Sequence, residues 1–380
     1  MNLLRDVEDL VCRLVAIESV NPDLVADGSG ESDLAEFVAS WLRELDLEVS
    51  IVEPVKGRPS VIGILRGSGG GSSLMLNAHM DTVGAGGMKR AFEPVVRDGR
   101  VYGRGAYDMK ASLAAIMLTA REARKLGLKG DLIITAVADE EVASFGTSAV
   151  LERFGADAAI VTEPTELRLC LAHKGFVWLE VKAEGLAAHG SRADLGVDAI
   201  GRMGRILTGV VNLDRRLRAG PGHRLLGRGS IHCSLIEGGQ EWSTYPARCE
   251  LKVERRTIPG EDAARSLGEM EALIAIAREE DPRLEASARV VLERAPSEVS
   301  PASPVATAVA RAAKEVLGQD PEVIGAAYWM DMALTNAAGI PTVGFGPSGE
   351  GEHADVEWVD LASVERCVDV YLRTAELLCS

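Results

Sequence analysis

The chain has 380 residues, of which 47% are hydrophobic and 26% are charged, which is typical of a globular protein with room for two ordinary domains. Its formal net charge of −16 argues against a surface that binds nucleic acid or an anionic membrane. The six cysteines are scattered and no apolar stretch is long enough to span a bilayer, so we expect a protein of the reducing cytoplasm rather than a disulfide-bonded or membrane protein.

From the N-terminus to Glu163, segments with helical and with strand-like patterns alternate. Apolar residues recur three and four positions apart in 7–17 and 34–45, which predicts two surface helices. Strands are predicted at 47–52 and 60–65, and a helix rich in Ala, Leu and Met is predicted at 111–126. This alternation predicts an α/β fold, with a mainly parallel sheet flanked by helices.

After Glu163 the pattern changes to period-two alternation, which is typical of a sheet with one solvent-facing side. Strand, helix, strand, strand, helix and strand are predicted at 176–183, 197–213, 230–236, 247–255, 260–280 and 284–292. This β-α-β-β-α-β order predicts a ferredoxin-like α+β unit. Because a helix at 304–317 and a buried strand at 342–345 return to the first pattern, we expect the unit to be an insertion.

Several of the predicted strands lead into acidic residues. The apolar run 74–78 is followed by His79 and Asp81, which share one side of an extended chain because they are two residues apart. The runs 101–106, 132–138 and 158–162 lead to further acids: Asp108, Asp139-Glu140-Glu141 and Glu163. The carboxyl edge of a parallel sheet is where ligands bind, and clustered carboxylates repel one another unless a cation neutralises them. One such pair would be a hydrogen-bonded strand end or a solvated acidic turn, but their repetition predicts a metal site.

Five short motifs follow one another along the chain: Ala78-His79-Met80-Asp81-Thr82-Val83, Gly103-Arg104-Gly105-Ala106-Tyr107-Asp108-Met109-Lys110, Asp139-Glu140-Glu141, Thr162-Glu163-Pro164 and Gly351-Glu352-His353. In content and order they resemble the zinc-dependent aminoacylase/carboxypeptidase family, the group that includes acetylornithine deacetylase, succinyl-diaminopimelate desuccinylase and glutamate carboxypeptidase. Each motif alone is weakly specific, but together they span residues 78–353. The resemblance implies a catalytic domain of residues 1–173 and 294–380, and an inserted lid and dimerisation domain of residues 174–293.

The resemblance also implies a site for two Zn²⁺ ions, with Co²⁺ or Mn²⁺ as substitutes. His79 and Glu163 would bind one ion, Glu141 and His353 would bind the other, and Asp108 would bridge both.

For catalysis, the resemblance implies that a water shared by the two ions attacks an amide carbonyl. Glu140 would be the general base that takes the proton of this water and passes it to the leaving amine. Asp81 would orient the imidazole of His79. The peptide bond between Asp108 and Met109 would be cis.

Two residues of the inserted domain complete the implied site. His189, which by itself would be an exposed turn histidine, would come from the partner subunit of a homodimer to stabilise the tetrahedral oxyanion. Arg256 would bind the substrate carboxylate, although the neighbouring Arg255 could do so instead. The chain departs from the family pattern at 243–246, where relatives often carry Asn before the proline.

We therefore expect a metal-dependent amidohydrolase that acts on an N-acyl amino acid, with acetylornithine-type deacetylation as the first expectation. A dipeptidase or carboxypeptidase that uses the same site is the alternative. A catalytically silent metal-binding module is a third interpretation, against which Glu140 argues because a pure binder has no use for a base. The expected partners are a small N-acyl amino acid or short peptide and a second copy of the chain, with no nucleic acid or membrane.

Overall fold

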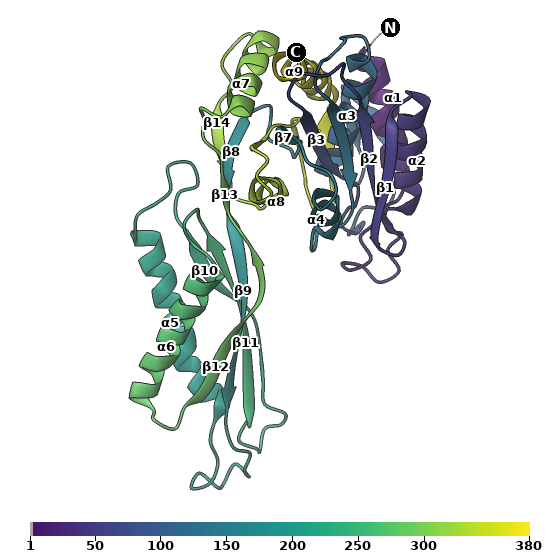
Figure 1. Cartoon of the computed structure of the whole chain (residues 1–380). Coiled ribbons are helices and arrows are strands. Elements are labelled where there is room, and N and C mark those ends of the chain that lie inside the picture. The colour runs from purple at the N-terminus through teal and green to yellow at the C-terminus, as the bar shows by residue number, and fades with distance from the viewer. Residues whose placement is uncertain (1–2) are drawn as a thin grey trace. The chain divides into compact units, whose positions relative to one another are not determined.

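The structure, a computed structural model, describes residues 3–380. The chain divides into two compact units (Figure 1). Unit 1 comprises the described residues up to Leu171 together with Val299–Ile324 and Met330–Ser380, and unit 2 comprises Ala172–Glu298 and Gly325–Trp329. The chain leaves unit 1 after Leu171 and returns at Val299, whose N–H donates to the carbonyl oxygen of Leu171 at 2.9 Å.

The main sheet has the strand order β1-β2-β6-β3-β7-β15-β8-β13, with β14 also paired to β8. Its strands are β1 (Glu48–Val55), β2 (Arg58–Leu65), β3 (Leu74–His79), β6 (Leu132–Val137), β7 (Ala158–Val161), β8 (Leu169–His173), β13 (Ser297–Glu298), β14 (Val323–Ala326) and β15 (Thr342–Gly344). The central pairs β6–β3, β3–β7 and β7–β15 are parallel, and antiparallel pairs flank them. The carboxyl ends of β3, β6 and β7 therefore lie at the same edge of the sheet.

Helices cover both faces of this sheet. They are α1 (Leu3–Ala16), α2 (Ser32–Glu44), α3 (Ala111–Ala123), α4 (Phe145–Leu151), α7 (Pro304–Leu317), α8 (Met332–Ala337) and α9 (Leu361–Leu378). Ile62 of β2 packs with Val150 of α4 on one face, while Gly63 faces Leu42 of α2 on the other. This arrangement confirms the predicted α/β class, in which both faces of a largely parallel sheet are buried.

A small separate sheet corrects one prediction. It has the order β16-β17-β5-β4, formed by β4 (Val95–Arg97), β5 (Arg100–Tyr102), β16 (Gly349–Glu350) and β17 (Trp358–Asp360). The predicted strand at 101–106 stops at Tyr102, and three residues later Gly105 turns the chain with a φ of 76° that suits glycine. Asp108 therefore does not end a strand of the main sheet. It lies in an irregular turn (Ala106–Lys110) directly before α3.

Unit 2 has the predicted β-α-β-β-α-β order. Its elements are β9 (Gly175–Glu184), α5 (Ala199–Ala219), β10 (Ser230–Gly238), β11 (Arg248–Thr257), α6 (Ala263–Glu280) and β12 (Glu285–Arg294). The antiparallel sheet order β10-β11-β9-β12 is that of a ferredoxin-like fold. Alternate residues of β9 are buried, so that Val177, Leu179 and Val181 pack in one core with Met203 of α5 and Met270 of α6.

None of the helices within residues 3–380 combines the length and the apolarity that crossing a bilayer requires.

Candidate metal centre

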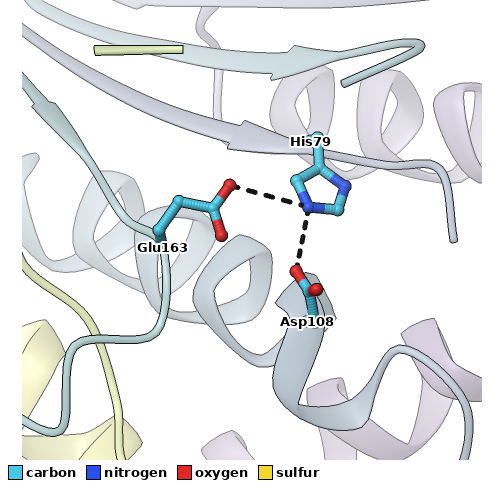
Figure 2. Close-up of side chains that lie close together, drawn as sticks. All are labelled: His79, Asp108 and Glu163. Atoms are coloured by element: carbon cyan, nitrogen blue, oxygen red, sulfur yellow. Dashed lines mark hydrogen bonds and ion pairs between the residues drawn. The ribbon is translucent and has the colours of Figure 1, made fainter. Parts of the chain in front are cut away.

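The first group of candidate ligands surrounds His79, the last residue of β3. Its ring is buried, and Nε2 lies 3.1 Å from Oδ1 of Asp108 and 3.7 Å from Oε1 of Glu163. Figure 2 shows this nitrogen between the two carboxylates. On the other side of the ring, Nδ1 lies 2.9 Å from the main-chain carbonyl oxygen of Asp81, to which it can donate. The hydrogen bond at Nδ1 leaves Nε2 as the nitrogen available to a metal.

The second group of candidate ligands surrounds His353, in the loop between β16 and β17. Its Nε2 lies 3.0 Å from Oε2 of Glu141 and 3.4 Å from Oδ2 of Asp108. Asp108 therefore directs one carboxylate oxygen toward each histidine. The two groups, His79-Asp108-Glu163 and Asp108-Glu141-His353, each have ligand atoms within 4.8 Å of one another. This is the arrangement that a carboxylate bridging two cations requires.

Local backbone conformations bring these side chains together. Glu163 follows β7 after Thr162, and Glu141 follows β6 after Asp139, which has a φ of 68°. His353 itself has a φ of 60°. The peptide bond between Asp108 and Met109 is cis, which confirms the expectation from the family resemblance.

Asp81 connects the two parts of the site. Its Oδ1 accepts the main-chain N–H of Glu140 at 3.1 Å, and its Oδ2 accepts that of Glu141 at 3.2 Å. Oδ1 also lies 3.5 Å from Nδ1 of His79. Asp81 thus contacts both the first histidine and the backbone of the loop that carries the two glutamates.

The cluster crowds carboxylates around two imidazoles, and this arrangement shifts the pKa values of both kinds of group. Burial, together with the charge of nearby Glu163, raises the pKa of Glu140 well above its usual value. Burial and the charges of neighbouring carboxylates, Asp108 among them, raise the pKa of Glu163 in the same way. Burial alone would lower the pKa of His79, but its hydrogen bonds to carboxylates raise it well above the usual range. Hydrogen bonds to Asp108 and Glu141 raise the pKa of His353 to about 10.

Raised pKa values on buried glutamates and on both imidazoles indicate a site that lacks positive charge of its own. Metal cations replace such protons on binding. Two imidazole nitrogens and three carboxylates are a donor set that suits Zn²⁺, Co²⁺ or Mn²⁺. The residues present therefore fit a pair of divalent ions.

A buried polar network beneath the glutamate loop was not found from the sequence. Asn21 donates from Nδ2 to Oδ2 of Asp81 at 2.8 Å and to Oδ1 of Asp139 at 3.1 Å. Arg58 donates from Nη2 to Glu31 at 2.6 Å and to Asp139 at 3.2 Å. These partners lie between 27 and 118 positions apart in the chain, so no local pattern could have identified them.

Two predicted site residues lie in unit 2, whereas all the candidate metal ligands lie in unit 1. His189 is exposed at an isolated β-bridge with Thr244, with Nδ1 2.8 Å from Oγ of Ser191. Arg256 of β11 is half-buried, with Nε 2.7 Å from Oε1 of Glu254 and its guanidinium 5.2 Å from the ring centroid of Phe176.

Arg255, the alternative to Arg256, points to the other face of β11 because neighbouring residues of a strand face opposite sides. Its side chain is buried and forms ion pairs with Glu261 at 2.9 Å and with Glu269 at 3.1 Å. The guanidinium of Arg255 is therefore already engaged inside unit 2.

Comparison with known proteins shows which family the sequence matches and which solved structures share the fold. Residues 75–377 match peptidase family M20/M25/M40. The acetylornithine deacetylase of Erwinia tasmaniensis is 29% identical over 97% of this chain and 96% of its own. The solved structure of aminopeptidase PepT from Bacillus cereus covers 99% of both chains with a TM-score of 0.82 and 19% identity. That of YXEP from Bacillus subtilis, described as a dinuclear metal-binding M20 peptidase, has a TM-score of 0.76 at 18% identity and covers 99% of this chain and 98% of its own.

Proposed function

Because the chain belongs to peptidase family M20/M25/M40 and is therefore a metal-dependent hydrolase, we propose that it is a two-metal amidohydrolase that cleaves the amide bond of an N-acyl amino acid. The observation that carries the proposal is the position of Asp108, whose two carboxylate oxygens face different histidines. The acetylornithine deacetylase relative supports acetylornithine-type deacetylation as the first substrate class to test.

In this proposal, His79 and Glu163 hold one ion, Glu141 and His353 hold the other, and Asp108 bridges them. The short distances within each group and the excess negative charge of the cluster support this assignment. Zn²⁺ is the proposed native metal, with Co²⁺ or Mn²⁺ as substitutes, because all three accept nitrogen and carboxylate ligands.

A pair of divalent ions, when bound, lowers the pKa of a water and polarises the carbonyl of the amide. Glu140 accepts a proton from the attacking water as the water oxygen bonds to the carbonyl carbon. The C–N bond then breaks, and Glu140 delivers the proton to the departing amine. Two features support this role of Glu140. The neighbouring Glu141 contacts His353, and the main-chain N–H of Glu140 donates a hydrogen bond to Asp81.

Unit 2 supplies the rest of the proposed site. We assign to residues 174–293 the role of a lid that also joins two chains in a homodimer, so that His189 of one chain donates to the developing oxyanion in the other. The exposed position of His189 supports this role. β10 is an edge strand that exposes Leu235 and Ile236, a surface suited to a second copy.

Substrate recognition is assigned to Arg256, which would bind the carboxylate of the amino acid through its guanidinium. The engagement of the neighbouring Arg255 with Glu261 and Glu269 supports this choice. The six free cysteines support the cytoplasm as the proposed compartment.

The alternative is a dipeptidase or carboxypeptidase that uses the same centre, and the fold shared with solved peptidase structures keeps it in consideration. The deciding experiment is an assay of the Zn²⁺- or Co²⁺-loaded protein on a panel of N-acyl amino acids, N-acetylornithine included, and on dipeptides. The proposal expects turnover of N-acyl amino acids and its loss in Glu140→Gln. Cleavage of dipeptides alone would establish the alternative, and metal binding without any hydrolysis would leave a binding module.

A further inference from the structure

Glu357 is a buried carboxylate whose two oxygens accept four N–H donors. Only 2% of the residue is exposed. Its Oε1 accepts the main-chain N–H of Tyr107 at 2.9 Å and that of Asp108 at 3.0 Å. Its Oε2 accepts the main-chain N–H of Gly105 at 2.9 Å and Nη1 of Arg104 at 2.7 Å. Glu357 therefore binds the backbone of the turn that presents the bridging carboxylate.

Arg104 extends the same set of contacts to two other loops. Its Nη2 donates to the carbonyl oxygen of Ala354 at 2.8 Å, and Ala354 directly follows His353. Its Nε donates to the carbonyl oxygen of Gly84 at 3.0 Å, in the segment that follows β3. Arg104 is itself only 2% exposed, so this ion pair with Glu357 is sheltered from solvent. Together the two residues join the turn of Asp108 to the loop of His353.

The turn needs external support because its own conformation departs from a helix. Asp108 has φ −114° and ψ 93°, and Met109 has φ −135° and ψ 36°. The N–H groups of Tyr107 and Asp108 accordingly bond to Glu357 rather than to the carbonyl groups of a preceding helical turn. Buried N–H groups without a partner are costly, so Glu357 stabilises this conformation in particular.

We propose that Glu357 is a positioning residue of the metal centre, which together with Arg104 fixes Asp108 and His353 relative to each other before any metal binds. The proposal rests on the proposed function in one respect, namely that Asp108 and His353 are metal ligands. Residues that orient metal ligands typically contribute a factor of about 10–100 to metal affinity or activity. Glu357 would act on the ligands through the backbone, without contacting a metal or a substrate.

The informative substitution is Glu357→Gln, which keeps the shape of the side chain. Each carboxylate oxygen of Glu357 accepts hydrogen bonds from two N–H groups. Whichever way the new amide points, its NH₂ group therefore faces two N–H groups, and it cannot accept a hydrogen bond from either. Exposed Glu350, in the neighbouring strand β16, gives the matched control Glu350→Gln, which removes the same charge from the surface.

Two measurements that need no substrate test the proposal. In the metal-free protein, hydrogen–deuterium exchange of the segment 103–110 should accelerate in Glu357→Gln and stay unchanged in Glu350→Gln. In Co²⁺ titrations followed by visible absorption, Glu357→Gln should bind Co²⁺ about 10–100-fold more weakly than the wild type. Glu357→Asp, which keeps the charge on a shorter side chain, should recover part of the affinity. Unchanged exchange and unchanged Co²⁺ affinity in Glu357→Gln would overturn the proposal.

Exchange of β6, at the centre of the main sheet of unit 1, reports whether the variant is folded. If Glu357→Gln does not fold, Arg104→Lys serves instead, because it keeps a positive charge but lacks the fork that reaches both Glu357 and Ala354. That variant should accelerate exchange at 351–357 and weaken Co²⁺ binding, and wild-type values for both would overturn the proposal. A wild-type protein that binds two Co²⁺ ions but hydrolyses no amide would contradict the proposed function and leave this inference standing.

Discussion

The carboxylate of Asp81 accepts a hydrogen bond from the main-chain N–H of Glu140 at 3.1 Å, between the segments that follow the neighbouring strands β3 and β6. From the sequence, Asp81 was expected only to orient His79. In the structure it also holds the backbone of Glu140 and Glu141, so one buried side chain sets the relative positions of a candidate ligand and the candidate base.

Substitution of Asp81 by Asn should therefore impair both metal binding and turnover. An amide has one acceptor oxygen. In Asp81, one carboxylate oxygen accepts a hydrogen bond from the main-chain N–H of Glu140, and the other accepts hydrogen bonds from the main-chain N–H of Glu141 and from Nδ2 of Asn21. We expect a loss of about 10–100-fold in metal affinity or in kcat/KM, measured by metal analysis after dialysis and by steady-state kinetics. Asp98→Asn, at an exposed turn, is the control. Wild-type values in Asp81→Asn would show that the contacts with the glutamate loop are dispensable.

Substitution of Glu140 by Gln should separate metal binding from proton transfer. Because the proposed ligands remain in place, the metal content should stay near two ions per chain in elemental analysis. Loss of the general base should lower kcat by about 10²–10⁴-fold. Near-normal turnover would exclude Glu140 as the base, and loss of an ion would reassign it as a ligand.

His189 provides a test of assembly as well as of catalysis. His189→Ala should lower kcat by about 10²–10³-fold, because it removes a donor used mainly in the transition state, and should leave metal content unchanged. Arg283→Ala, at an exposed residue of the same unit outside β10, is the control.

Mixing inactive His189→Ala chains with inactive Glu140→Ala chains tests whether the histidine acts on the partner subunit. A mixed dimer contains one intact site if His189 works in the partner, so activity should return after subunit exchange. Confirmed exchange without activity would assign His189 to its own chain or to no catalytic role.

Stability in acid should depend on the buried ring of His173. Its Nδ1 lies 2.9 Å from the carbonyl oxygen of Lys174, to which it donates, while Nε2 has no partner among the described residues. Burial lowers the pKa of His173 from 6.5 to about 4. The unfolded chain therefore binds a proton between these values that the folded chain does not. The stability contributed by the neutral ring is complete above pH 6.5 and declines as the pH falls toward 4.

Between pH 7 and pH 5 this difference amounts to about 2 kcal/mol. Urea unfolding at the two pH values should show that His173→Asn, whose amide can still donate to Lys174, loses correspondingly less stability than the wild type. His232→Asn is the matched control, since it removes an exposed histidine and leaves the buried ring intact. Equal losses in His173→Asn and the wild type would mean that other groups determine the acid sensitivity.

The sequence allowed the central strands and unit 2 to be predicted because their patterns are local. The apolar runs before His79 and Glu163 are β3 and β7, and the period-two pattern of 176–183 is β9. Helix α9 was not predicted, although its buried residues Val364, Val368 and Tyr371 recur at helical spacing.

What could not be predicted depends on contacts between distant segments. The run before Asp108 has the pattern of a strand, but β5 belongs to a separate sheet, in which it pairs with β4 and with β17, more than 200 positions later. Glu357 is an isolated acid in the sequence, yet it contacts the backbone of Tyr107 and Asp108. Asn21 and Arg58 lie outside every motif that was recognised, and only the folded chain brings them to Asp139.

β15 pairs with β7 in the middle of the main sheet, yet residues 172–298 lie between them in the chain. A protein is synthesised from its N-terminus, and early domains fold as they emerge from the ribosome. β3, β6 and β7 are therefore made well before β15, and His353 is made later still. A growing chain carries His79 and Glu163 long before the second histidine exists. The candidate metal centre can thus be completed only after the whole of unit 2 has been synthesised.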